Sequence, residues 1–400
     1  MNEAHRLEAR VQLAWLAAAM VLGMVPWFSA TVAAPGMTAE WRLSPASIVW
    51  VTIAVQLGFV VGTFVSATLL LSDRLRTRYF AASAAFVAGV ATLLLVWRDI
   101  NAAGAIGLRL VTGVALAGVY PPGIKIAAGW WKERRGTAIG VLVGALTLGS
   151  AAPNLVRVMA ATADWRSIIV AAGTASLLSA AIFAFAVREG PFHAPSARFD
   201  PRAILLVLRD RGVVLATAGY LGHMWELYAM WSSIGAFWLV MATRYDMAPS
   251  SAAGLAFLTI GAGALGCVVA GSVADRVGRP IVTIAAMAVS GACALAIGPS
   301  MSVSVAWVAF VAMVWGISIV ADSAQFSAAV TELAPVQYVG TAITLQTCLG
   351  FLLTILTIRA VPVWADRWGW ERAYMPLAIG PALGIVAMWI LWRAERAQHT

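Results

Sequence analysis

The sequence is a succession of apolar runs, each about 20–28 residues long, separated by short charged segments. Runs of this length can cross the ~30 Å hydrocarbon core of a bilayer as helices. Only 11% of the 400 residues are charged, whereas soluble domains carry roughly 25%. Alternating ten-residue strands, the signature of an outer-membrane barrel, do not occur. The sequence therefore predicts an all-α, polytopic membrane protein.

Twelve transmembrane helices are expected, and the segment between the sixth and the seventh is rich in arginine and proline. This composition predicts a first six-helix bundle at 1–187, a cytoplasmic linker at 188–212 and a second bundle at 213–400. Little sequence remains for a separate soluble catalytic domain. The twelve spans are placed at 11–34, 47–71, 79–97, 102–131, 137–160, 166–187, 213–240, 251–272, 281–299, 303–333, 338–360 and 372–393.

The basic residues predict the orientation. If the N-terminus is cytoplasmic, seventeen of the 27 Lys and Arg residues lie on the cytoplasmic side and eight on the other side. The remaining two, Arg109 and Lys125, lie within a span. An excess of basic residues on the cytoplasmic side favours cytoplasmic termini and an even number of spans, in a cytoplasmic (inner) membrane. Because the net charge of +9 resides mainly in short loops, we expect no nucleic-acid partner.

The two predicted bundles contain matching motifs in the same order. Asp73-Arg74 corresponds to Asp275-Arg276, at an offset of 202 residues. The sequence GTAI at 136–139 recurs at 340–343, and Trp165 corresponds to Trp370, at offsets of 204 and 205 residues. Ordered matches at one spacing indicate a parallel repeat of six helices, which is a common device of transporters.

These motifs resemble those of the major facilitator superfamily. Residues 271–279, GSVADRVGR, are similar to the family's loop signature G-x-x-x-D-R-x-G-R, and 109–113, RLVTG, are similar to its helix 4 signature R-x-x-x-G. The resemblance implies two pseudo-symmetric bundles and secondary transport by alternating access. It also implies a central cavity lined by the first, fourth, seventh and tenth helices.

Two shorter stretches, 120–125 and 222–231, resemble members grouped with nitrate/nitrite and cyanate-type anion porters. Nitrate porters bind their anion with arginines in the second and eighth helices, but 47–71 and 251–272 contain no charged residue. The resemblance therefore does not carry nitrate over as the substrate, and we expect a small organic or inorganic anion with proton coupling. Proton-driven efflux of a lipophilic or cationic compound and a membrane-embedded sensor remain alternatives.

No enzyme activity, cofactor or metal site is expected. The signatures G-x-x-x-x-G-K-[ST], H-E-x-x-H and G-x-S-x-G are missing from the sequence. The three cysteines lie within apolar runs, which favours packing roles. The expected partners are a small-molecule substrate, protons and the lipid bilayer, and we expect a monomer.

Few ionisable residues occur within the predicted spans. Placing such a side chain in the membrane costs ~2.5–3.5 kcal/mol, so each one is a candidate for a functional or pairing role. His223 and Glu226 are three residues apart in the seventh span, so they share one face of a helix. An imidazole beside a buried carboxylate can take up and release a proton. We expect this pair to handle protons and substrate. The alternative is that the two side chains bond to each other or to neighbouring polar side chains and only fix helix packing.

Asp322, in the tenth span, shares a helix face with Ser318 and Gln325, and we expect Asp322 and Gln325 to contact the substrate. A buried carboxylate requires a cation or a proton, and the candidates are Arg109, His223, a substrate cation or H⁺. Arg109, in the fourth span, can bind an anionic substrate in bidentate fashion, or it can pair with Asp322 or Glu226. By helical spacing, Tyr120 is expected on the same face as Arg109 and is a further candidate for contact with the substrate.

Several further residues complete the predicted site. Pro121, Pro122 and Gly123 should break the fourth span, and Lys125 beyond them is expected to anchor the helix at the interface. Trp231 and Gln346 are further candidates for substrate contacts, with core packing as the alternative for the tryptophan. The resemblance also implies a cytoplasmic gate, in which the aspartates after the second and eighth spans contact the starts of the eleventh and fifth. The gate residues would be Asp73, Arg74, Asp275, Arg276 and Arg279.

Overall fold

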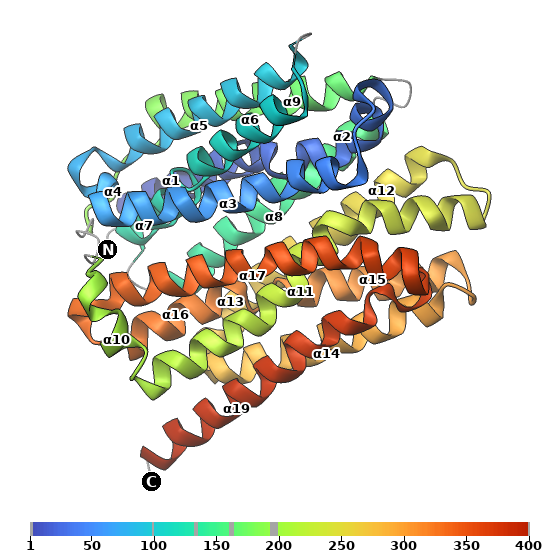
Figure 1. Ribbon diagram of the computed structural model, residues 1–400. Helices are drawn as coiled ribbons and strands as arrows, with labels where there is room; N and C mark the ends of the chain where they lie inside the picture. Colours follow the sequence, from blue (N-terminus) through green and yellow to red (C-terminus); the bar gives the residue numbers. More distant parts are fainter. Residues whose placement is uncertain (1–2, 98–99, 132–134, 160–163, 193–198, 399–400) are drawn as a thin grey trace. The chain divides into compact units, whose positions relative to one another are not determined.

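The computed structural model describes residues 3–97, 100–131, 135–159, 164–192 and 199–398. Helices account for nearly all of these residues, and the described ranges contain no strand (Figure 1). The predicted all-α class is therefore confirmed. The chain divides into two compact units, Met1–Ser196 and Ala197–Thr400, and this boundary falls inside the segment 188–212.

The N-terminal unit contains nine α-helices and one short 3₁₀ helix among its described residues. They are α1 (Glu3–Met24), α2 (Pro26–Trp41), α3 (Pro45–Leu69), α4 (Leu71–Arg74), α5 (Thr77–Leu93), η1 (Leu94–Val96), α6 (Ala102–Leu116), α7 (Tyr120–Trp130), α8 (Arg135–Met159) and α9 (Trp165–Phe185).

The C-terminal unit is built in the same way from its described residues. Its elements are η2 (Pro201–Ala203), α10 (Ile204–Val207), α11 (Arg211–Arg244), α12 (Pro249–Gly261), α13 (Gly263–Val277), α14 (Arg279–Ser300), α15 (Val305–Ile319), α16 (Ser323–Leu333), η3 (Val336–Tyr338), α17 (Val339–Trp368), α18 (Trp370–Ala373), η4 (Met375–Ala378) and α19 (Ile379–Gln398).

Within the described residues, eleven helical segments are long and apolar enough to cross a membrane. Each matches one of the predicted spans, but four are clearly longer than predicted: Arg6–Trp41, Pro249–Val277, Val336–Trp368 and Trp370–Ala397. The predicted seventh span corresponds to α11, whose 34 residues also exceed the length that a span needs. α11 carries the ionisable residues His223 and Glu226.

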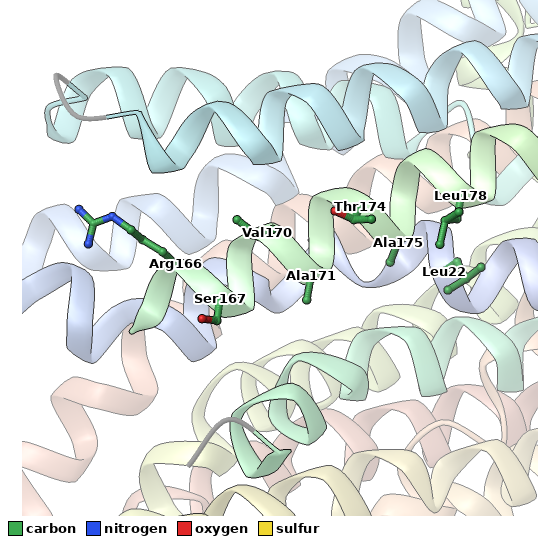
Figure 2. A pocket seen from close by; sticks show the side chains of 8 residues that line it. All are labelled: Leu22, Arg166, Ser167, Val170, Ala171, Thr174, Ala175 and Leu178. Carbon is green, nitrogen blue, oxygen red and sulfur yellow. The ribbon is translucent and has the colours of Figure 1, made fainter. Parts of the chain in front are cut away.

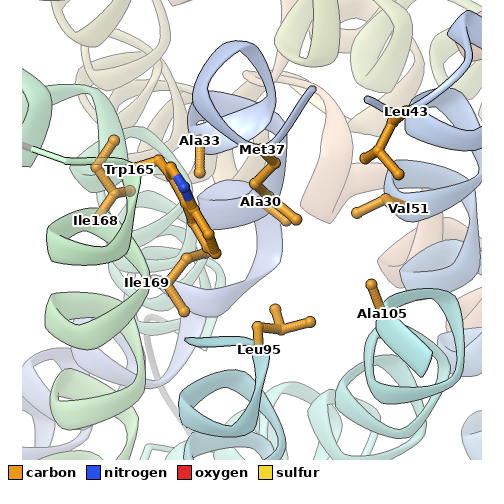
Figure 3. Close-up of a cluster of buried hydrophobic side chains, with 10 residues drawn as sticks. All are labelled: Ala30, Ala33, Met37, Leu43, Val51, Leu95, Ala105, Trp165, Ile168 and Ile169. Atoms are coloured by element: carbon orange, nitrogen blue, oxygen red, sulfur yellow. The ribbon is translucent and has the colours of Figure 1, made fainter. Parts of the chain in front are cut away.

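A buried apolar cluster holds one end of the N-terminal unit together (Figure 3). The indole of Trp165, at the start of α9, packs among small side chains of α2 such as Ala33. It meets the ring of Trp41 edge-on, with the centroids 5.1 Å apart. Its Nε1 donates to Glu40 Oε2 at 2.9 Å, so the tryptophan keeps its polar atom bonded while its rings fill the core.

The same close helix contact occurs in both units. In the N-terminal unit, a Cβ atom at Gly113 of α6 would overlap the carbonyl oxygen of Val55 in α3. In the C-terminal unit, a Cβ atom at Gly316 of α15 would overlap the carbonyl oxygen of Thr259 in α12. The two glycines are 203 residues apart, and their two partners are 204 apart. The internal repeat is therefore also visible as a repeated backbone contact, which only a residue without a side chain permits.

The predicted fourth span is interrupted at 117–119, between α6 and α7. Pro121 and Pro122 follow, and they lack the N–H groups that would bond the carbonyls of Ala117 and Gly118 in a continuous helix. The predicted break is confirmed, immediately upstream of the prolines. Lys125 Nζ, in α7, donates to the carbonyl of Ser72 at 3.0 Å, in agreement with the expected anchoring role.

The predicted tenth span is interrupted at 320–322, between α15 and α16. This break lies 203 residues after the break in the fourth span, the same offset as that between Gly113 and Gly316. Asp322 occupies the N-cap position of α16, but its side chain does not cap the helix. The break therefore leaves the carboxylate of Asp322 available for another partner.

Candidate functional site

The partner of Asp322 is His223, in the middle of α11. The imidazole Nδ1 and the carboxylate Oδ1 are 2.9 Å apart, and each residue is 1% exposed. The rings of Tyr220 and Phe326 lie beside the imidazole, with centroid distances of 6.1 and 5.6 Å. His223 Nε2 has no hydrogen-bond partner among the described residues. This imidazole therefore meets a carboxylate on one side and keeps a second nitrogen available.

Glu226 has a different environment, one turn along the same helix. Its Oε1 accepts a hydrogen bond from Trp315 Nε1 at 2.6 Å, and its Oε2 accepts one from Ser290 Oγ at 2.9 Å. Glu226 is 1% exposed. Within the described residues, no Lys, Arg or His lies within ion-pair distance of it. This carboxyl group is thus held by neutral donors from α15 and α14.

His223 and Glu226 share one helix face, as the sequence indicates, but each side chain bonds to a residue of another helix. Among the partners expected for Asp322, the structure shows His223. Sequence reasoning missed Ser290 and Trp315, which lie within apolar runs with no local signal that they face Glu226. Only the packing of α14 and α15 against α11 brings these two donors to the carboxyl group.

Arg109 is fully buried, with an exposure of 0%. Its Nη1 donates to the carbonyl of Pro26 at 2.8 Å, and its Nη2 donates to the carbonyl of Trp27. Both acceptors belong to the first turn of α2. Nε has no partner within the described part of the chain. The contacts that the structure gives for this guanidinium are therefore to backbone, and none of its described partners is a carboxylate.

The break at 117–119 also changes the interpretation of Tyr120. The expected shared face with Arg109 assumes one continuous helix, whereas the structure places Tyr120 at the first residue of α7, beyond the break. Helical spacing therefore does not relate the two side chains. Tyr120 is half-buried at this position.

Gln325 belongs to a polar cluster at one end of the C-terminal unit. Its Oε1 accepts a hydrogen bond from Arg279 Nη1 at 2.8 Å. Arg279 also contacts Asp275 Oδ1 and Glu332 Oε1, each at 3.2 Å. Gln325, which is expected to contact the substrate, thus bonds to Arg279, which is expected to belong to the gate. We call Asp275, Arg279, Gln325 and Glu332 the loop cluster.

The remaining gate residues lie at helix ends. Asp275 and Arg276 are in the last turn of α13, not after it, because this helix continues to Val277. Asp73 and Arg74 end the short helix α4. Arg74 and Arg276 are exposed, and the side chain of Asp73 lies outside the described residues.

Gln346 and Trp231 are both buried. The indole of Trp231 packs against Tyr228, with centroids 5.6 Å apart, in agreement with the packing alternative. Gln346, in α17, is 1% exposed, and neither polar atom of its amide has a partner among the described residues. A buried amide of this kind is available to a ligand that offers a donor and an acceptor.

A groove with a volume of about 540 Å³ runs along α9 in the N-terminal unit (Figure 2). Arg166, which pairs with Glu40 and Asp164, lies at one end, and Leu178 lies at the other. None of the predicted site residues lines this groove. The structure also shows no group of three or more His, Cys, Asp or Glu side chains able to hold a metal ion in its described parts.

Long apolar helices, interrupted spans and deeply buried ionisable side chains define a multi-pass membrane protein of the transporter type. The family model described as Major Facilitator Superfamily matches residues 16–358. The chain therefore belongs to the major facilitator superfamily, whose members are secondary transporters of solutes and not enzymes, and the predicted family resemblance is confirmed. No curated protein matches the sequence.

Proposed function

We propose that the protein moves a small anion across the cytoplasmic membrane by alternating access, coupled to protons. The observation that supports coupling is Glu226, a buried carboxyl group bonded by Trp315 and Ser290 without a described basic partner. A charge at such a position requires compensation by an opposite charge or by a proton. A proton on Glu226 provides that compensation, so we assign this residue as the main proton site.

The hydrogen bonds around Glu226 suit both protonation states. When the group is ionised, Ser290 and Trp315 each donate to one of its oxygens. When Oε2 carries a proton, it can donate to Ser290 Oγ, and Ser290 can donate onward to the carbonyl of Met287, 3.2 Å away. Glu226 can therefore gain or lose a proton while the buried donors around it keep their hydrogen bonds.

The pair of His223 and Asp322 is the second group that can hold a proton. With His223 protonated and Asp322 ionised, the pair carries no net charge, whereas loss of the proton leaves one buried negative charge. Since Glu226 is one turn from His223, the charge of the pair acts on the proton at Glu226. We propose that His223 tunes Glu226 in this way and that Asp322 sets the orientation of the imidazole.

Arg109 favours an anion as the substrate. Its guanidinium is always charged under ordinary conditions, it is fully buried, and its described partners are two backbone carbonyls. A buried cation without an acidic partner is compensated by an anionic ligand, and a guanidinium binds carboxylates and related oxyanions with good geometry. Nε, which has no hydrogen-bond partner in the described part of the chain, is the donor available for that contact.

Proteoliposomes with an imposed pH gradient test the coupling. The substrates offered are nitrate, cyanate, formate, acetate and glycolate, and both gradient-driven accumulation and exchange between loaded sides are followed. Glu226→Gln is expected to abolish accumulation but to keep exchange, because the glutamine mimics the protonated state. The control is Asp366→Asn, which removes an exposed carboxylate and should leave both activities unchanged.

Infrared spectroscopy during a pH titration tests the proton site without any substrate. A protonated buried carboxyl group absorbs in the carbonyl-stretching region, and Glu226→Gln should remove that band. Accumulation at the wild-type level by Glu226→Gln would exclude this residue as the proton site, with Asp322 the next candidate. Transport restricted to lipophilic cations would favour the efflux alternative.

We further propose cytoplasmic termini and a monomeric carrier, on the basis of the distribution of basic residues. In this orientation the loop cluster lies at the cytoplasmic end of the C-terminal unit. We propose that Asp275, Arg276 and Arg279 act as gate residues in the C-terminal unit, and that Asp73 and Arg74 act as gate residues in the N-terminal unit. Labelling of single exposed cysteines in sealed vesicles tests the orientation.

A further inference from the structure

Gln56, in α3, is a buried polar side chain that the predicted site does not include. It is 0% exposed, and neither Oε1 nor Nε2 has a hydrogen-bond partner within the described residues. An amide buried without partners costs about 1–3 kcal/mol or more. Buried polar groups are nearly always satisfied in native proteins, so an exception of this kind calls for a ligand or another explanation.

The neighbours of Gln56 show which element its amide faces. Thr52, Gln56 and Phe59 lie on one face of α3, at spacings of four and three residues. The hydroxyl of Thr52 lies 2.9 Å from that of Thr31. The ring of Phe59 packs against that of Trp27, with centroids 4.9 Å apart. Gln56, between these two contacts, therefore faces the segment of α2 from Trp27 to Thr31.

Arg109 reaches the same part of α2 from α6. Its two Nη atoms bond to the carbonyls of Pro26 and Trp27, and its Nε is without a partner in the described chain. The start of α2 thus brings together two buried side chains with unused hydrogen-bonding capacity. Arg109 offers one donor and a positive charge, and Gln56 offers a donor from Nε2 and an acceptor at Oε1.

We propose that Gln56 and Arg109 form a subsite for a small carboxylate that also carries a hydroxyl or amine donor. Arg109 Nε and Gln56 Nε2 donate to the anionic oxygens, and Gln56 Oε1 accepts the hydrogen bond of the ligand's own donor. A pure acceptor such as nitrate leaves Oε1 unsatisfied. This inference rests on the proposed anionic substrate, and it narrows that class to anions such as glycolate.

Thermal unfolding of the detergent-solubilised protein tests the subsite with glycolate, acetate and nitrate as probes. Glycolate and acetate differ by one hydroxyl group, so their relative affinity reports on Gln56 Oε1. For the wild type, the dependence of the unfolding midpoint on ligand concentration should give an affinity about tenfold higher for glycolate than for acetate, which corresponds to one hydrogen bond.

Gln56→Leu should abolish the preference for glycolate and should unfold, without ligand, at no lower temperature than the wild type. The second expectation follows because an apolar side chain of similar size replaces an unsatisfied amide. Thr52→Val is the matched control: it disrupts the adjacent contact with Thr31 and should retain the preference.

Two results would overturn the inference in distinguishable ways. If Gln56→Leu unfolds at a clearly lower temperature and keeps the wild-type preference, Gln56 has a structural role and the anionic substrate still stands. If none of the three anions raises the unfolding midpoint of the wild type, the proposed anionic substrate fails, and this subsite fails with it.

Discussion

The imidazole of His223 and the carboxylate of Asp322 meet at the break between α15 and α16, with Nδ1 and Oδ1 2.9 Å apart. α16 begins at this contact and runs to the loop cluster. Gln325, three residues after Asp322, bonds to Arg279, and Glu332 bonds to the same arginine near the end of the helix. One eleven-residue helix thus connects the buried contact of His223 with Asp322 to Arg279 at the start of α14.

The first prediction concerns the energetic coupling of this pair. Removal of one member of a buried ion pair leaves the other without compensation, so Asp322→Leu should lower the free energy of unfolding by about 3 kcal/mol. His223→Phe should have an effect of the same sign. The double variant should lose clearly less than the sum of the single losses, because neither polar side chain is then left buried without its partner. Chemical denaturation in detergent micelles measures all four proteins, and strictly additive losses would show that the two residues do not interact.

The second prediction concerns the indole bonded to Glu226. Trp315→Phe keeps an aromatic ring but removes the donor at 2.6 Å from Oε1, which should destabilise the protein by about 1–3 kcal/mol. The infrared band of protonated Glu226 should also move to higher frequency, because its carbonyl loses a hydrogen bond. Trp307→Phe, at a tryptophan that is 47% exposed, is the control and should leave the band unchanged. An unmoved band in Trp315→Phe would contradict the assignment.

The sequence predicts the fold well because the apolar runs are long and the loops are short. Membrane-spanning length and Pro121–Pro122 are local properties, so the spans and the break in the fourth span follow from the chain itself. No proline follows the break at 320–322 within its first turn. The position of Asp322 at a helix break therefore emerges only from the structure.

The partners of the buried side chains are much harder to predict. Spacing places His223 and Glu226 on one face of α11, but it does not say which helix lies opposite each of them. Ser290 and Trp315 reach Glu226 through contacts between helices that are distant in sequence. Gln56 is missed for a related reason: an amide in an apolar run is common, and only its lack of hydrogen-bond partners among the described residues makes it unusual.

The third prediction concerns the loop cluster. Arg279→Gln should remove the charge that joins Asp275, Gln325 and Glu332, and the backbone amides of α16 should then exchange faster with solvent deuterium. Glu332→Gln should have a small effect, within about 1 kcal/mol, because its carboxylate is mostly exposed. The effect of Gln325→Leu on amide exchange should lie between those of Arg279→Gln and Glu332→Gln, since the bond of Gln325 to Arg279 is partly buried. Equal amide exchange in the wild type and in Arg279→Gln would show that the loop cluster does not stabilise α16.

The last prediction concerns the repeated glycine contact, which brings α6 against α3 and α15 against α12. An added methyl group at Gly113 or Gly316 would overlap a backbone carbonyl of the neighbouring helix, and backbone cannot give way as a flexible side chain can. Gly113→Ala and Gly316→Ala should therefore each destabilise the protein by about 1–3 kcal/mol or more. Gly107→Ala is the matched control in α6, because a Cβ atom there has no neighbour within 4 Å.

In that control the alanine should be neutral or should stabilise the helix by roughly 0.5–1 kcal/mol, since glycine weakens a helix interior. The three variants make the same chemical change, so a difference among them reports on helix contact and not on helix propensity. Thermal unfolding of the three purified variants beside the wild type measures the difference. If Gly316→Ala were as stable as Gly107→Ala, the close approach of α15 to α12 would be wrong.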